Sequence, residues 1–146
     1  MEKQFCISHD ELKQVNACLK AAVRFGFVEK EGLNEVILRC QKHNCDIKEK
    51  LEQGETVYGV THFTYPAYLQ YELTRFRLDF VSGKAQNYSY ASITPEEKMD
   101  FYKNNMDLFR RDVGNCFAYE DVEAVIEKRI REEEYYQYVQ KLLCQF

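Results

Sequence analysis

The stretch Glu55-Thr56-Val57-Tyr58-Gly59-Val60-Thr61-His62-Phe63 decides between an all-helical fold and a mixed one. Its β-branched residues favour an extended backbone, but the segment is short and contains Gly59. A strand needs partner strands for independent stability, and no second segment of the chain has a good strand pattern. We therefore predict that this stretch is an extended connector between helices and that the fold is all-α.

A helix is predicted directly before the connector. It begins near Gly32 and ends at Gln53-Gly54, where glycine can take the left-handed conformation that terminates helices. An apolar stripe runs along it at helical spacing, and Asn44 is the polar exception on that stripe. The apolar members are Leu33, Val36, Ile37, Cys40, Ile47 and Leu51.

Another helix is predicted directly after the connector. Thr64 caps it, and Pro66 lies in the first turn, where its missing N–H costs little. Ser82-Gly83 ends it, and a polar, tyrosine-rich loop follows to Ile93. The helix carries a broad aromatic stripe: Tyr65, Tyr68, Leu69, Leu73, Phe76, Phe80 and Val81.

Three more helices complete the chain. Ser8 and Glu11 form a capping box for the first, which stops at Gly26. The stretch Thr94-Pro95-Glu96-Glu97 opens the fourth, which extends through Phe109 and is broken by Val113-Gly114-Asn115. The last runs from about Ala118 to Leu143, with an acidic start and Lys141 near its end, as the helix dipole favours.

The sequence thus predicts one domain, residues 1–146, built as an orthogonal assembly of five helices. The long C-terminal helix packs back on the N-terminal helices. Only 6 Gly and 2 Pro occur in 146 residues, so few residues interrupt helices. We find no internal repeat and no linker.

Composition excludes several classes of function. The net charge of −4 argues against a general nucleic-acid binder, which needs a basic face to displace counterions. No apolar run is long enough to span a bilayer. Residues Met1 to Asp10 lack the basic-then-apolar pattern of a secretory signal, so we expect a cytoplasmic protein.

Six cysteines are dispersed along the chain: Cys6, Cys18, Cys40, Cys45, Cys116 and Cys144. A chain of this length builds a core without disulfides, so we expect reduced thiols that act as small buried hydrophobes. Cys40 and His43 lie one helical turn apart, but Cys45 lies on another face and no matching second pair follows. We predict no metal site and no cofactor.

The order of three segments resembles the helical part of the SurA/PrsA-type peptidyl-prolyl isomerases. The first segment is a helix with a central Asn44, then Gly54-Glu55-Thr56-Val57-Tyr58-Gly59, then a helix with Tyr65, Tyr68 and Tyr71. The second runs from Ile93-Thr94-Pro95-Glu96-Glu97 to Asn105, followed by Leu108-Phe109, and looks like the segment before the parvulin domain. The third, from Ala118-Tyr119-Glu120-Asp121-Val122 onward, looks like the helix that returns to the core.

The chain departs from this family at the joint from Arg110 to Phe117. In the family, a whole parvulin domain lies between the second and third segments, and here only this joint connects them. The catalytic His/Cys/Asp set of the family therefore has no place in the chain. What the resemblance implies is the helical core, which in such proteins cradles extended, aromatic-rich peptide segments or mediates self-association.

Aromatic residues are the first candidates for a binding surface, because they give large contact area at low entropic cost. With 11 Tyr and 10 Phe, the chain has an excess of them. Plain core packing with scattered surface tyrosines is the alternative. The candidate peptide-binding residues are Tyr58, Phe63, Tyr65, Tyr68, Tyr71 and Phe76, and the wider aromatic set includes Tyr88 and Tyr90.

Three residues are candidates for catalysis. His62 and Tyr58 flank Gly59 in the connector, and a histidine near a phenol can transfer protons on a bound substrate. Cys116 precedes the last helix, whose N-terminus could lower the pKa of the thiol. A structural role is the alternative for each, and no pattern in the chain names a reaction.

Three functional hypotheses follow. The leading one is a non-catalytic helical module that binds an extended peptide or an unfolded protein segment, either as a chaperone or as an accessory to a peptide-processing enzyme. The second is a small enzyme that isomerises or cyclises a peptide on the same core. The third is a helical homodimer, or a complex with a partner protein, formed through the amphipathic last helix.

Overall fold

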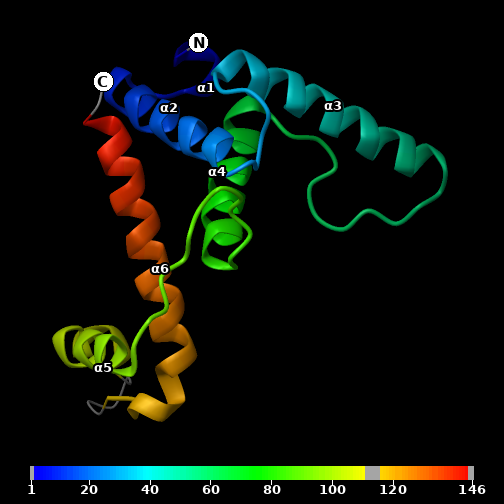
Figure 1. Cartoon of the computed structure of the whole chain (residues 1–146). Coiled ribbons are helices and arrows are strands. Elements are labelled where there is room, and N and C mark those ends of the chain that lie inside the picture. Colours follow the sequence, from blue (N-terminus) through cyan, green and yellow to red (C-terminus); the bar gives the residue numbers. More distant parts are fainter. Residues whose placement is uncertain (1, 111–115, 145–146) are drawn as a thin grey trace.

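The computed structural model describes residues 2–110 and 116–144, and this part of the chain contains helices and no strands (Figure 1). The only strand-like pairing described is an isolated bridge between Arg110 and Cys116. The all-α prediction is confirmed, with one short additional N-terminal helix. The helices are α1 (Glu2–Phe5), α2 (His9–Arg24), α3 (Leu33–Glu52), α4 (Tyr65–Val81), α5 (Pro95–Asn104), the 3₁₀ helix η1 (Met106–Phe109) and α6 (Tyr119–Leu143).

Side-chain caps fix where the helices begin. In α2, the Glu11 amide donates to Ser8 Oγ at 3.2 Å and the Ser8 amide donates to Glu11 Oε2 at 2.7 Å, which completes the predicted capping box. Thr64 and Thr94 accept from the amide three residues on in the same way. Each cap satisfies one N–H that has no partner within its helix.

The fourth predicted helix ends earlier than the sequence pattern indicated. The structure ends α5 at Asn104, and Met106 and Phe109 lie in the separate helix η1. The side chain of Asn105 donates to the Phe101 carbonyl at 2.9 Å, which is the carbonyl that the Asn105 backbone amide would bond in a continuing α-helix. The side chain thus replaces the helical bond and ends the helix. The predicted break at Val113-Gly114-Asn115 lies outside the described residues.

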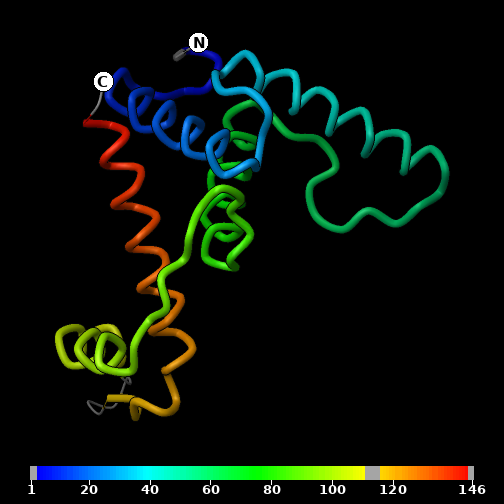
Figure 2. Tube along the Cα trace, viewed as in Figure 1, coloured from blue at the N-terminus to red at the C-terminus, as the bar shows by residue number. Residues whose placement is uncertain are grey.

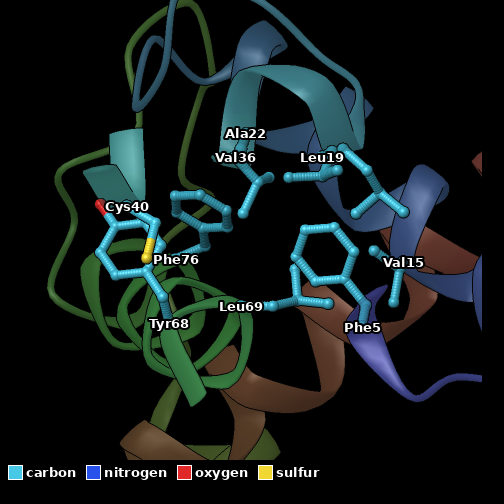
Figure 3. Close-up of a cluster of buried hydrophobic side chains, with 10 residues drawn as sticks. Phe5, Val15, Leu19, Ala22, Val36, Cys40, Tyr68, Leu69 and Phe76 are labelled. Atoms are coloured by element: carbon cyan, nitrogen blue, oxygen red, sulfur yellow. The ribbon is translucent and has the colours of Figure 1, made fainter. Parts of the chain in front are cut away.

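The first hydrophobic cluster joins α1, α2, α3 and α4 (Figure 3). In Figure 3, the Phe5 ring lies between Val15 of α2 and Leu69 of α4, while Tyr68 lies beside Cys40 of α3. These side chains come from four helices, so burying them fixes how the helices cross. The buried members are Phe5, Val15, Leu19, Ala22, Leu33, Val36, Cys40, Tyr68, Leu69 and Phe76.

The second cluster attaches the C-terminal half of α6 to α2 and α4. Phe25 and Phe80 pack against Tyr135, Val139 and Leu142, so the last helix does return to the N-terminal ones. The predicted loop after α4 contributes to this cluster, because its tyrosines Tyr88 and Tyr90 pack against Phe80 at centroid distances of 5.1 and 5.2 Å.

The third cluster forms at the opposite end of α6, away from the first two. Phe109 of η1 and Val122 and Ile126 of α6 are buried there, and Phe101 and Tyr102 of α5 cover them. Figure 1 shows that α6 runs the length of the molecule between this end and α2. At 25 residues, α6 is about 38 Å long. Within the described ranges, no helix combines the length and the apolar character that crossing a bilayer requires.

A partly buried ion pair joins α3 to α4. The Arg39 guanidinium donates from Nε and Nη2 to the two carboxylate oxygens of Glu72 at 2.7 and 2.9 Å, and Glu72 is buried. The Tyr68 hydroxyl also hydrogen-bonds Glu72, and burial together with this carboxylate raises the pKa of Tyr68. Tyr68 therefore stays a neutral donor. Such two-pronged pairs are among the stronger hydrogen-bonded contacts in proteins.

We expect Glu72→Gln to destabilise the fold by about 3 kcal/mol, because it leaves the largely covered Arg39 without its counter-ion. Urea unfolding followed by circular dichroism measures this change. The matched control is Asp79→Asn, whose partners Arg75 and Lys84 are exposed ion-pair donors at 3.7 Å. That control should cost less than about 1 kcal/mol. Equal effects of the two variants would contradict a special role for the partly buried pair.

Candidate functional site

The connector leaves the far end of α3 and folds back toward the start of α4 (Figure 2). The outer half of α3 and this connector project from the rest of the molecule as one arm. Within that arm, Ile47 is buried while Leu51, Tyr58 and Val60 are exposed. The predicted extended connector is thus confirmed as non-helical and unpaired with a strand.

Asn44 holds the returning end of the connector against α3. Its side-chain amide donates to the Phe63 carbonyl at 2.9 Å, and its side-chain oxygen accepts from the Phe63 amide at 2.7 Å. An amide side chain carries both a donor and an acceptor, so it pairs with both backbone groups of one residue. The Cys40 thiol donates to the same carbonyl at 3.6 Å. These contacts explain why a polar residue interrupts the apolar stripe of α3.

An aromatic cluster lies beside this clamp. His43 of α3 lies 5.3 Å from the Phe63 ring, 5.6 Å from the Tyr68 ring and 5.9 Å from the Tyr71 ring, measured between centroids. Phe63 also contacts Tyr71 at 5.3 Å. Rings at these separations attract one another beyond their burial of area. They set the connector against both α3 and α4.

Two adjoining hollows open between the arm's α3 and residues 61–66, with volumes of about 520 and 360 Å³. We call them together the α3–connector groove. They share Asn44, Cys45 and His62, and Lys48 is the one formally charged side chain among the lining residues. The lining is Gln4, Gln41, Asn44, Cys45, Lys48, Leu51, Thr61, His62, Phe63, Thr64, Tyr65 and Pro66. The larger hollow falls in the size range of small-ligand and peptide pockets.

The candidate peptide-binding residues divide between this groove and the core. Phe63 and Tyr65 line the groove. Tyr68 and Phe76 are only 7% and 3% exposed and belong to the first cluster, where Tyr68 contacts the Phe63 ring and Phe76 lies against Phe27. Tyr71 is 39% exposed beside the aromatic cluster, and Tyr58 is 90% exposed on the connector. Tyr88 and Tyr90 of the wider aromatic set pack against the second cluster and do not line the groove.

The three candidate catalytic residues are not assembled into one site. His62 lines the groove, whereas the Tyr58 side chain projects into solvent. Cys116 lies at the α5 end of the molecule, where its thiol donates to the Met106 carbonyl at 3.8 Å. Since nucleophile and base must lie within hydrogen-bonding reach, Cys116 and His62 cannot act together.

All six cysteines are free thiols, but only Cys40 is fully buried. Cys18 and Cys116 are partly covered, and the other three are exposed, so the prediction of buried thiols holds for Cys40 alone. The reason is local, because Cys6 and Cys144 lie at element ends and Cys45 lies on the open face of α3. Among residues 2–110 and 116–144, no group of three or more His, Cys, Asp or Glu side chains could hold a metal ion.

A carboxylate-rich cleft of about 260 Å³ lies between α6 and residues 91–93, a feature that the sequence patterns did not indicate. Glu97, Glu133 and Glu134 line it. Glu134 accepts from Arg131 Nη1 at 2.8 Å and from the Tyr88 hydroxyl. Burial, and then the bond to Glu134, raises the pKa of Tyr88 to about 12, so Tyr88 remains a donor at neutral pH. Glu134 thus holds the loop on α6.

The sequence analysis also missed Glu72, which lines a smaller hollow with Arg39. A signal for it was present. Glu72 lies four residues after Tyr68, three after Leu69 and four before Phe76, so it falls on the buried aromatic stripe of α4. A carboxylate on a buried stripe requires a cationic partner.

Comparison with known proteins yields a fold likeness. No family model matches the chain, and no curated protein matches it. Two crystal structures of the GH136 lacto-N-biosidase from Eubacterium ramulus, native and selenomethionine-labelled, each match with a TM-score of 0.78 at 23% sequence identity. Each match covers 92% of this chain but only 28% of the enzyme chain. Identity at this level shows a shared fold, and the resemblance to the SurA/PrsA family stays a prediction.

We expect Asn44→Ala to release the connector, because it removes both hydrogen bonds to Phe63. Hydrogen–deuterium exchange at the Phe63 amide should accelerate, and unfolding free energy should fall by about 2 kcal/mol, since each lost bond contributes about 1 kcal/mol.

Asn34→Ala is the matched control, because Asn34 is an exposed residue on the same helix. It should change the unfolding free energy by less than about 0.5 kcal/mol. Unchanged exchange at Phe63 in Asn44→Ala would show that the clamp does not hold the connector.

Proposed function

We propose that this chain is a non-catalytic, polypeptide-binding helical module that serves as the accessory part of a glycoside hydrolase. The observation that carries the proposal is the fold likeness to a lacto-N-biosidase over 92% of this chain and 28% of the enzyme chain. In that enzyme the same fold is joined to more than twice its own length of other polypeptide. A helical unit in such a setting has hydrolase polypeptide beside it to bind.

The distribution of charged groups supports a non-catalytic role. Glycoside hydrolysis ordinarily uses two carboxyl groups that face each other across the scissile bond. The α3–connector groove has no Asp or Glu among its lining residues. The Glu72 carboxylate accepts two hydrogen bonds from Arg39, and the Glu134 carboxylate accepts hydrogen bonds from Arg131 and Tyr88. Glu72 and Glu134 are therefore held in structural contacts, and Glu97 and Glu133 are the other carboxylates of the cleft at α6.

The arm supports a binding role. It exposes Leu51, Tyr58 and Val60 on a segment held to the body by α3 and by the Asn44 clamp. Tyrosine and aliphatic side chains in such positions are typical of surfaces that bind other polypeptides. The alternative, an enzyme acting on a peptide, has less support because Tyr58, His62 and Cys116 do not converge.

The proposal predicts complementation of a truncated hydrolase. The Eubacterium ramulus enzyme is truncated by removing the helical part that matches this chain. The truncated enzyme is then expressed alone, together with its own helical part as a separate chain, or together with this chain. We expect this chain to co-elute with the truncated enzyme in size-exclusion chromatography and to raise its soluble yield and lacto-N-biosidase activity above those of the truncated enzyme alone. This chain by itself should show no such activity.

The enzyme's own helical part is the positive control for assembly between separate chains. If that part co-elutes with the truncated enzyme while this chain stays monomeric at every concentration, accessory function toward this hydrolase is excluded. Lacto-N-biosidase activity of this chain alone, abolished by Glu97→Gln or Glu133→Gln in the cleft at α6, would overturn the non-catalytic role.

A further inference from the structure

We propose that the α3–connector groove holds an extended, largely uncharged segment of polypeptide, with an apolar residue at the Tyr65 end and a carboxylate at the Lys48 end. This inference rests on the proposed function and deepens it, because it names the surface and the chemistry of the segment that binds there. Four observations carry it: the length of the groove, its neutrality, its unpaired backbone and its single terminal cation.

The groove has the length of a short strand. Its α3 wall runs from Gln41 to Leu51, ten residue-to-residue steps that span about 15 Å at the helical rise. An extended chain covers that distance in about four or five residues, at about 3.3 Å each. The opposite wall, residues 61–66, runs back along the same helix.

Thr61 and His62 are the residues of the wall opposite α3 whose backbone groups are unpaired, because Phe63 is bonded to Asn44 and the Thr64 carbonyl accepts from the Tyr68 amide. Among the described residues, the backbone groups of residues 56–62 make no hydrogen bond to any other backbone group. An extended peptide carries one donor and one acceptor per residue and can pair with such a segment, as in strand addition to an exposed edge. A folded ligand surface would present few of these groups. The unpaired backbone of Thr61 and His62, which continues outside the groove into residues 56–60, therefore favours an extended occupant at that end.

The side chains of the groove select against charge except at one end. Phe63, Tyr65 and Pro66 make one end apolar, and the wall between the ends carries Asn44, Cys45 and His62. Lys48 and the apolar Leu51 line the other end, and none of the ion pairs described for the chain includes Lys48. A carboxylate is the complementary group for this ammonium. A saccharide could use the same amides and rings, and it becomes an outcome of the test.

Cys45 provides a built-in reporter of occupancy. It is exposed and lies in the middle of the groove, while Cys6 and Cys144 are exposed elsewhere and serve as internal controls. The full chain is treated with iodoacetamide, and alkylation at each cysteine is timed by mass spectrometry. Four probes are used. The first is reduced, carboxymethylated α-lactalbumin, which is unfolded and has blocked thiols. The others are the peptide acetyl-Gly-Thr-Val-Leu-Val-Thr-Gly-Glu-amide, the same peptide with Lys in place of its Glu, and lacto-N-biose.

We expect the unfolded protein and the Glu-ended peptide to protect Cys45 alone. At a probe concentration about nine times Kd, Cys45 should react about tenfold more slowly, because only about one tenth of the grooves are free. The Lys-ended peptide should bind more weakly. Lys48→Glu should reverse this preference, and Lys50→Glu, two residues away and outside the groove lining, should leave it unchanged.

A blocking variant gives an independent measure. Cys45→Arg places a long charged side chain in the groove from an exposed position and should abolish peptide binding measured by fluorescence anisotropy. Cys144→Arg, at an exposed position after α6, should bind as the unsubstituted chain does. Circular dichroism checks that both variants remain folded.

The outcomes separate this inference from the proposed function. Saturable binding of the unfolded protein without protection of Cys45, and unaffected by Cys45→Arg, overturns the groove and leaves the accessory role standing. Protection of Cys45 by lacto-N-biose but by neither peptide overturns a polypeptide occupant. Protection by the Glu-ended peptide together with failure to complement the truncated hydrolase supports the groove and removes the hydrolase as partner.

Discussion

The ion pair between Arg39 and Glu72 is the constraint on which the arm depends. Glu72 is buried on α4, so its charge is tolerated only if a cation on a neighbouring helix reaches it with good geometry. Arg39 meets that demand with two hydrogen bonds and thereby fixes the position and rotation of α3 on α4. Because α3 is one continuous helix, fixing it there also places Asn44 and Cys45 further along. The connector, its clamp and the groove follow from that placement.

Packing divides the chain between the two ends of α6. The first two clusters bind α1 to α4 and the C-terminal half of α6, whereas the third binds α5 and η1 to its N-terminal half. Of the short joint, Arg110 and Cys116 pair with each other, and the Cys116 thiol donates to the Met106 carbonyl of η1 beside that third cluster. The arm that lines the α3–connector groove lies away from that end of the molecule (Figure 1).

Local signals in the sequence predicted where the helices begin, but they did not predict which side chains pair between helices. Ser8, Thr64 and Thr94 mark helix starts because a cap bonds an amide three residues away, within the reach of a sequence pattern. The early end of α5 depends on one side chain, Asn105, bonding one carbonyl, and propensity does not specify that choice. Glu72 and Arg39 are separated by 33 positions, and Asn44 and Phe63 by 19, so only the tertiary fold pairs them. Aromatic composition likewise could not separate Tyr68, which is buried, from Tyr58, which is exposed.

The helix α6 connects the two ends of the molecule. The C-terminal half of this helix packs against α2 and α4 through the second cluster, while the N-terminal half packs against α5 and η1 through the third. Helices of this length curve gently, and a bend of about 10° at the midpoint would shift the end of the helix that carries α5 sideways by about 3 Å. The length and straightness of α6 therefore set the separation between α5 at one end and α2 at the other.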